Sequence, residues 1–194
     1  MTGMKKILAI IFYFCLFISP SNSNDIDEFQ LDGINIGQSL LELVDKKYIE
    51  AEKYYAYENK KMFQVPFPNQ DKSSKYEGFQ FSIFENDKNF IIESVEGFIF
   101  MKFTKCKDEM KKVSNDIRYA FPSLKTSFKP FQKSDDGTVY AYNNFYITGG
   151  HSIRVICTDH PKKLEEDFGY EDNLRVVINS AKFNNWLNEE SFKP

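Results

Sequence analysis

Two cysteines lie on the apolar faces of two segments with different periodicities, and this pair constrains the fold more than any other feature. The first apolar stripe recurs every three or four residues, as in a helix: Cys106, Met110, Val113 and Ile117. The second alternates with outward-facing residues, as in a strand: Ile153, Val155 and Cys157. We therefore expect both sulfur atoms to point into one core, where a helix at residues 105–121 packs on a sheet.

The N-terminal segment predicts export. Lys5 and Lys6 precede an apolar run at residues 7–18, which is followed by small and polar residues up to Ser23. A basic region, a short apolar region and small residues at the cleavage site are typical of a secretory signal peptide. The apolar run would form a helix of about 18 Å, too short to span about 30 Å of hydrocarbon. We expect residues 1–23 to be removed and the mature chain to be periplasmic or secreted.

Export in turn predicts a disulfide between Cys106 and Cys157. Cys15 would leave with the signal peptide, and the bulky residues before it do not form a lipid-attachment site. In an oxidising compartment the two remaining cysteines are expected to pair. Closing a loop of about fifty residues stabilises a fold by about 4 kcal/mol in the chain-entropy model. A redox pair or a thiol nucleophile is the alternative, but the CxxC spacing of a redox pair is missing.

The composition fits one globular domain and excludes some classes of partner. Of the 194 residues 42% are hydrophobic, and 20 Phe and 11 Tyr supply apolar surface for a core. We expect a single α+β domain over residues 24–194. Without residues 1–23 the chain has 23 basic and 28 acidic side chains, a formal net charge of −5, and no polybasic segment. Nucleic acid is not expected as a partner, and neither is stable membrane insertion after cleavage.

Periodicity and turn residues predict an α+β fold with a mainly antiparallel sheet and helices packed on one face. In the first half, a capping box from Ser39 to Glu42 starts a helix with the apolar stripe Leu41, Val44 and Tyr48. An edge strand at 63–67 follows, and then a hairpin with arms at 78–84 and 90–103 and a bulge at Gly97.

The second half repeats the order of a helix followed by strands, which is consistent with a structural pseudo-repeat. After the helix at 105–121, a loop leads to a turn at 135–137. Strands are predicted at 138–148, 152–158 and 174–179, and a short helix at 183–188.

The sequence contains no motif for catalysis or metal binding. His151 and His160 are predicted in loops, and the GxSxG, HExxH and P-loop patterns are absent. The acidic run from His160 to Asp172 lacks the spacing of a calcium loop, so we interpret it as a solvated loop. We therefore predict no catalytic residue, no cofactor and no metal site.

The clearest candidate binding surface is one face of the C-terminal sheet. Alternation along the three strands places five side chains on the face opposite Val139, Phe145, Val155 and Val176. These five are Tyr140, Tyr142, Tyr146, Arg154 and Arg175. Tyrosine and arginine are frequent in protein-binding hot spots, and arginine stacks on aromatic rings. The alternative is that these residues only pair across strands or are covered in the fold.

Two segments resemble small exported bacterial proteins of unknown function. They are DGINIGQSLL, residues 32–41, and GYEDNLRV, residues 169–176, with FNNW at residues 183–186 near the end. This resemblance implies export and a compact α+β domain. The predicted order of elements is also similar to small envelope modules of the outer-membrane assembly lipoprotein and β-lactamase-inhibitor-protein type. That similarity is an analogy of fold and does not fix function.

Three functions remain open from the sequence. The leading hypothesis is an exported, non-enzymatic binding or accessory domain that uses the Tyr/Arg face for a protein or small-molecule partner. The second is an exported hydrolase whose site is built from acidic residues and a histidine without a motif. The third is a toxin, inhibitor or immunity-like partner protein.

Overall fold

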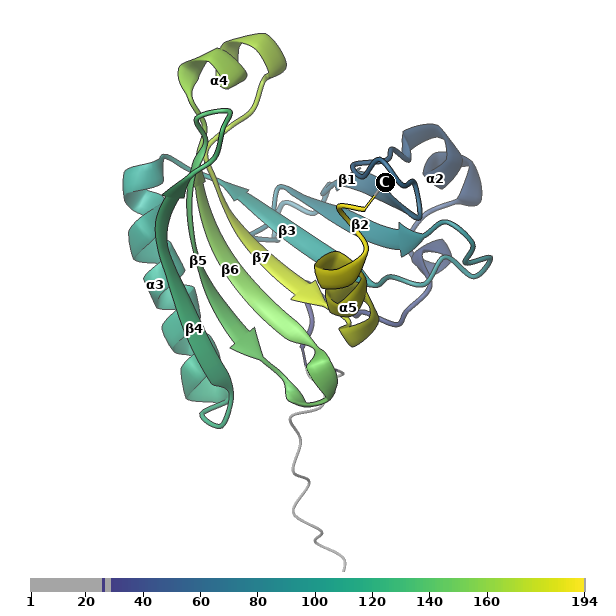
Figure 1. The fold of residues 1–194 in the computed structure, drawn as a ribbon, viewed down its shortest axis with the longest axis horizontal. Coiled ribbons are helices and arrows are strands. Elements are labelled where there is room, and N and C mark those ends of the chain that lie inside the picture. Colours follow the sequence, from purple (N-terminus) through teal and green to yellow (C-terminus); the bar gives the residue numbers. More distant parts are fainter. Residues whose placement is uncertain (1–25, 27–28, 194) are drawn as a thin grey trace, which may run out of the picture.

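The computed structural model describes residue 26 and residues 29–193, so the predicted signal peptide and its cleavage site lie outside the described residues (Figure 1). Seven strands in the described part form one antiparallel sheet. The strands are β1 (Met62–Pro68), β2 (Gly78–Phe84), β3 (Ser94–Phe100), β4 (Lys125–Lys133), β5 (Val139–Tyr146), β6 (Ser152–Asp159) and β7 (Asn173–Asn179). The α-helices are α2 (Lys46–Glu52), α3 (Phe103–Ala120), α4 (Lys162–Phe168) and α5 (Ala181–Glu189). The predicted α+β class with an antiparallel sheet is confirmed.

The order of strands across the sheet is β1-β2-β3-β7-β6-β5-β4. The sequence of a helix followed by strands does occur twice, as α2 with β1 to β3 and as α3 with β4 to β7. The two groups join where β3 pairs with β7, so that Ser94 lies opposite Asn179, 85 residues later. This central pairing makes the two groups one continuous sheet.

Helix α3 packs on one face of the sheet, which we call the inner face (Figure 1). Cys106 on α3 is bonded to Cys157 on β6, with an S–S distance of 2.07 Å, and both residues are fully buried. The predicted disulfide is therefore confirmed. The apolar side chains of the inner face continue across all central strands, for example through Val95, Ile178 and Ile153.

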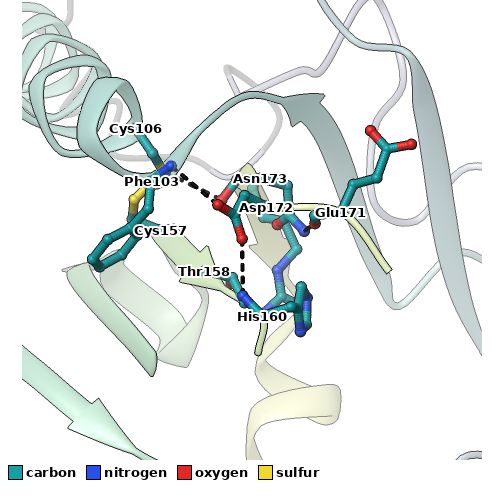
Figure 2. Close-up of a disulfide and its surroundings, with 9 residues drawn as sticks. Phe103, Cys106, Cys157, Thr158, His160, Glu171, Asp172 and Asn173 are labelled. Atoms are coloured by element: carbon teal, nitrogen blue, oxygen red, sulfur yellow. Dashed lines mark hydrogen bonds between the residues drawn. A yellow bond between two sulfur atoms is a disulfide. The ribbon is translucent and has the colours of Figure 1, made fainter. Parts of the chain in front are cut away.

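Asp172, just before β7, ties the start of α3 to the end of β6 (Figure 2). One carboxylate oxygen accepts a hydrogen bond from the backbone N–H of Phe103 at 3.3 Å, and the other accepts from the backbone N–H of His160 at 2.9 Å. The disulfide lies one helical turn further along α3. A covalent and a polar link therefore fix the same end of this helix to the sheet.

Helix α5 packs on the opposite face, which we call the open face, at the end of β1 and β2 (Figure 1). Phe183 and Trp186 of α5 bury Met62 and Phe84, which lie side by side on that face. Ser180 caps the helix by accepting a hydrogen bond from the Phe183 N–H. The helices are thus not confined to one face, contrary to expectation, because the stripe of a short helix does not indicate which face it covers.

The first predicted helix is wrong in its extent. Residues Leu40–Glu42 form a single 3-10 turn, with Ser39 as its cap, and α2 begins separately after Asp45. Leu40 is fully buried, whereas Leu41, placed in the predicted apolar stripe, is 43% exposed. One turn buries a single leucine here, and the chain then changes direction before α2.

Two segments predicted as loops are regular elements. Residues 125–133 form the edge strand β4, whose side chains are almost all exposed and therefore show no alternation. Residues 162–168, within the predicted acidic loop, form α4. Gly97 was predicted at a bulge, but it pairs in unbroken register between Phe79 and Val176.

Candidate functional site

The open face carries polar side chains of the central strands together with the tyrosines of β5. The pairing of the strands places one row across it, from β3 to β4: Phe98, Arg175, Ile156, Tyr142 and Lys129. By the same alternation, all five residues predicted as a binding surface share this face: Tyr140, Tyr142, Tyr146, Arg154 and Arg175. Helix α3 and the disulfide lie on the other side.

The half of the open face on β4, β5 and β6 carries six side chains that we call the aromatic strip: Lys125, Lys129, Tyr140, Tyr142, Tyr146 and Arg154. The guanidinium of Arg154 lies over the ring of Tyr142, 5.0 Å from its centroid, and its Nε donates a hydrogen bond to Asn144 Oδ1 at 2.8 Å. The rings of Tyr140 and Tyr142 are nearly parallel, at 10°, with centroids 6.2 Å apart. Arg154 is thus held as a half-buried cation in a fixed orientation.

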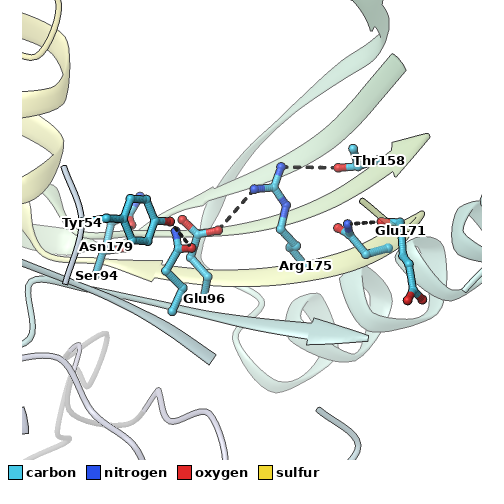
Figure 3. Close-up of polar contacts among 9 residues, drawn as sticks. Tyr54, Ser94, Glu96, Thr158, Glu171, Arg175 and Asn179 are labelled. Atoms are coloured by element: carbon cyan, nitrogen blue, oxygen red, sulfur yellow. Dashed lines mark hydrogen bonds and ion pairs between the residues drawn. The ribbon is translucent and has the colours of Figure 1, made fainter. Parts of the chain in front are cut away.

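Arg175 lies on the central strand β7 and faces Glu96 and Thr158 (Figure 3). One terminal nitrogen of its guanidinium faces Glu96 on β3 at 3.3 Å, and the other donates to Thr158 Oγ1 at 3.4 Å. The carboxylate of Glu96 is largely buried. The charge of Arg175 is therefore balanced within the sheet, whereas Arg154 has no ion pair in the described part of the chain.

A cleft of about 650 Å³ opens beside Arg175, between β1 to β3 and the segment Gly169 to Glu171. Its apolar walls come from distant parts of the chain: Tyr54, Pro66, Pro68, Phe98, Phe100 and Tyr170. The hydroxyl of Tyr54 donates to Gln80 Oε1 at 2.7 Å, and burial raises the pKa of Tyr54 to about 12. The phenol therefore stays protonated and remains a hydrogen-bond donor at neutral pH.

Neither histidine has the geometry of a general base paired with a carboxylate. His160 lines the cleft, but its Nδ1 faces the hydroxyl of Thr138 at 3.4 Å, and the Asp172 carboxylate bonds its backbone N–H instead. Burial, followed by the nearby Arg175, lowers the pKa of His160. His151 Nδ1 accepts a hydrogen bond from the backbone N–H of Ala181 at the start of α5. Both rings have structural contacts that account for them.

Residue 26 and residues 29–193 contain no group of three or more His, Cys, Asp or Glu side chains arranged to hold a metal ion. The same ranges contain no helix that is both long and apolar enough to cross a bilayer.

Of the five predicted binding residues, only Arg175 lines the cleft, and the other four belong to the aromatic strip. Sequence reasoning missed Tyr54, Phe98, Phe100 and Tyr170. A signal was present for two of them, because Glu96, Phe98 and Phe100 alternate on one face of a strand. Tyr54 and Tyr170 lie outside strands and helices, and only the tertiary fold brings them to the cleft.

Comparison with protein-family models, with curated proteins and with solved structures found no match to this chain, so no residue role is transferred from a relative.

Proposed function

We propose that this chain is an exported, non-enzymatic binding domain, and that the aromatic strip holds an acidic segment of a partner protein. The proposal is supported by the state of Arg154. This cation is half-buried, oriented by Asn144 and stacked on Tyr142, and no carboxylate of the described residues pairs with it. An arginine fixed in this way presents its remaining donors to a carboxylate at little cost in side-chain entropy.

Charge on the surrounding strands favours the same partner. Strands β4, β5 and β6 carry three lysines and one arginine but a single carboxylate, Asp159. Lys125 and Lys129 lie opposite Tyr146 and Tyr142 on the open face. A basic and aromatic surface on a chain of net charge −3 is complementary to acidic protein segments.

Two further observations agree with a binding domain. The disulfide is typical of proteins from oxidising compartments, which supports export. Among the described residues, the rings of His151 and His160 are hydrogen-bonded to Ala181 and Thr138 and not to carboxylates. The hydrolase hypothesis therefore gains no support from the described residues.

The test uses a random copolymer of glutamate and tyrosine as a probe for acidic protein segments, with binding measured by fluorescence anisotropy. We expect Arg154→Ala to weaken binding at least about tenfold, as truncation of a hot-spot arginine does. Arg154→Lys should bind the copolymer only slightly better than Arg154→Ala does, because lysine lacks the planar guanidinium of arginine. The matched control is Arg118→Ala, which removes an exposed arginine that lies over Phe145 from helix α3.

An equal loss of affinity for the copolymer in Arg154→Ala and Arg118→Ala would contradict the proposal, because binding would then depend on net charge alone. Tighter binding of a single-stranded thymidine oligonucleotide than of the copolymer would also contradict it, because the strip would then favour nucleic acid. Melting temperatures of the variants should match the unmodified chain within a few degrees.

A further inference from the structure

The cleft beside Arg175 is a second concave feature of the open face, and its lining differs from the aromatic strip. Its volume of about 650 Å³ lies within the range of small-molecule sites, which is about 300–1,000 Å³. Its lining includes the aromatic residues Tyr54, Phe98, Phe100 and Tyr170. Phe100 and Tyr170 are 45% and 50% exposed, so that their rings are available to a ligand.

The charge of the cleft is negative. Glu77 and Glu171 line it, and the Glu77 carboxylate is held beside Phe100 by the backbone N–H of that residue, at 3.2 Å. The one arginine in the lining, Arg175, is already paired with Glu96. Burial lowers the pKa of His160, which favours its neutral form at pH 7. The lining is left with an excess of carboxylates and no unpaired cation among its residues.

Within the described part of the chain, no lysine or arginine lies over the aromatic rings of the cleft. The described residues contain eight contacts in which a lysine or arginine lies over a ring, and none involves an aromatic residue of the cleft lining. Aromatic faces beside carboxylates are the chemistry by which proteins bind ammonium and guanidinium groups. The lining is thus complementary to a positively charged ligand with an apolar body.

We propose that the cleft binds a small organic cation, an alkyl- or arylalkylammonium, whose charged group lies near Glu171 and Tyr170 and whose apolar body packs against Phe98 and Phe100. This site goes beyond the proposed function, because it uses different residues and a ligand of opposite charge.

The experiment compares three probes of similar shape by NMR titration of the protein: 2-phenylethylammonium, 2-phenylethanol and 3-phenylpropionate. We expect the ammonium to bind at least about fivefold more tightly than the alcohol, with the carboxylate weakest, and chemical shifts to change at residues of the cleft. Tyr170→Ala and Glu171→Gln should each lower the affinity for 2-phenylethylammonium by about two- to fivefold.

Matched controls lie outside the cleft. Tyr119→Ala removes a tyrosine of α3 that is 91% exposed, and Glu166→Gln removes an exposed carboxylate of α4. Both should leave the affinity for the ammonium within about twofold, as expected of surface changes. Circular dichroism should show that Tyr170→Ala is folded, since that side chain is half exposed.

Three results would overturn the proposal: no binding of the ammonium at millimolar concentration, binding of the carboxylate as tight as that of the ammonium, or equal losses in the cleft and control variants. Arg154→Ala separates this site from the aromatic strip. It should leave the affinity for the ammonium unchanged, so that failure of one proposal does not affect the other.

Discussion

The ring of Tyr76 fills the space that a β-carbon on Gly97 would occupy. A β-carbon built on Gly97 would lie 2.5 Å from Cδ1 and 2.7 Å from Cε1 of that ring. Tyr76 also packs against Phe79, with ring centroids 5.4 Å apart, and burial raises its pKa to about 12. The glycine is therefore required by the packing of a partly buried ring over β3, and not by a bulge.

We expect Gly97→Ala to destabilise the fold by about 1–3 kcal/mol, because the added methyl group clashes with the packed ring of Tyr76. Urea unfolding of the single and double variants checks this. If the clash with Tyr76 is the cause, Tyr76→Ala combined with Gly97→Ala should cost less than the sum of the two single changes. Additive losses would instead attribute the cost to the β3 backbone.

Loss of the disulfide should lower the free energy of unfolding by about 4 kcal/mol, since the linked cysteines are 51 residues apart. The comparison is between the oxidised chain and the variant Cys106→Ser/Cys157→Ser in urea. Thiol titration of the unfolded, non-reduced protein should find no free thiol from Cys106 or Cys157. Two titratable thiols from this pair would contradict the pairing.

The stability of the chain should depend on pH through His160. Burial and the neighbouring Arg175 lower its pKa in the folded state from 6.5, against the opposing carboxylates of Asp172, Asp136 and Glu165. The unfolded chain therefore binds this proton at a higher pH than the folded chain does. The free energy of unfolding should fall as the pH drops through the region just below 6.5.

His160→Gln removes that proton-binding group. Between about pH 7.5 and pH 5.5, the variant should lose less stability in urea than the unmodified chain does. Carboxylates contribute to the pH dependence of both proteins. The difference between the two slopes of unfolding free energy against pH therefore measures the contribution of His160. Identical slopes would contradict the expectation.

Asp172→Ala should destabilise the fold by about 1–3 kcal/mol, because it leaves the N–H groups of Phe103 and His160 without their acceptor. Asp167→Ala, an exposed change on α4, is the matched control and should stay within about 0.5 kcal/mol. The melting temperatures of both variants, compared with that of the unmodified chain, test this expectation. Equal shifts would show that the Asp172 carboxylate contributes no more than a surface charge.

Sequence patterns predicted the elements that bury one face. The limits of β2 were predicted without error, and those of α3 within two residues. Apolar residues alternate along β2 and recur every three or four residues along α3, on the side that faces the core. β4 was missed because an edge strand with exposed side chains has no pattern to read. Its Pro130 and its shift in register between Lys129 and Gln132 further weaken the signal of a strand.

Of the two candidate surfaces, the aromatic strip could be predicted from the sequence and the cleft could not. Alternation placed Tyr142 and Arg154 on one face, because side chains of a strand alternate whatever surrounds them. The cleft could not be predicted, because it requires Tyr54, Phe98 and Tyr170 to meet. They meet only because β3 pairs with β7, and no local pattern specifies a pairing between strands 85 residues apart.

The last strand of the sequence is the central strand of the sheet. When the chain emerges with its N-terminus first, β1 to β3 and β4 to β6 have no shared edge until residues 173–179 follow. Both cysteines have emerged by residue 157, so oxidation can link α3 to β6 while the sheet is still in two parts. Order of emergence therefore allows the covalent link to form early, and insertion of β7 is the step that completes the sheet.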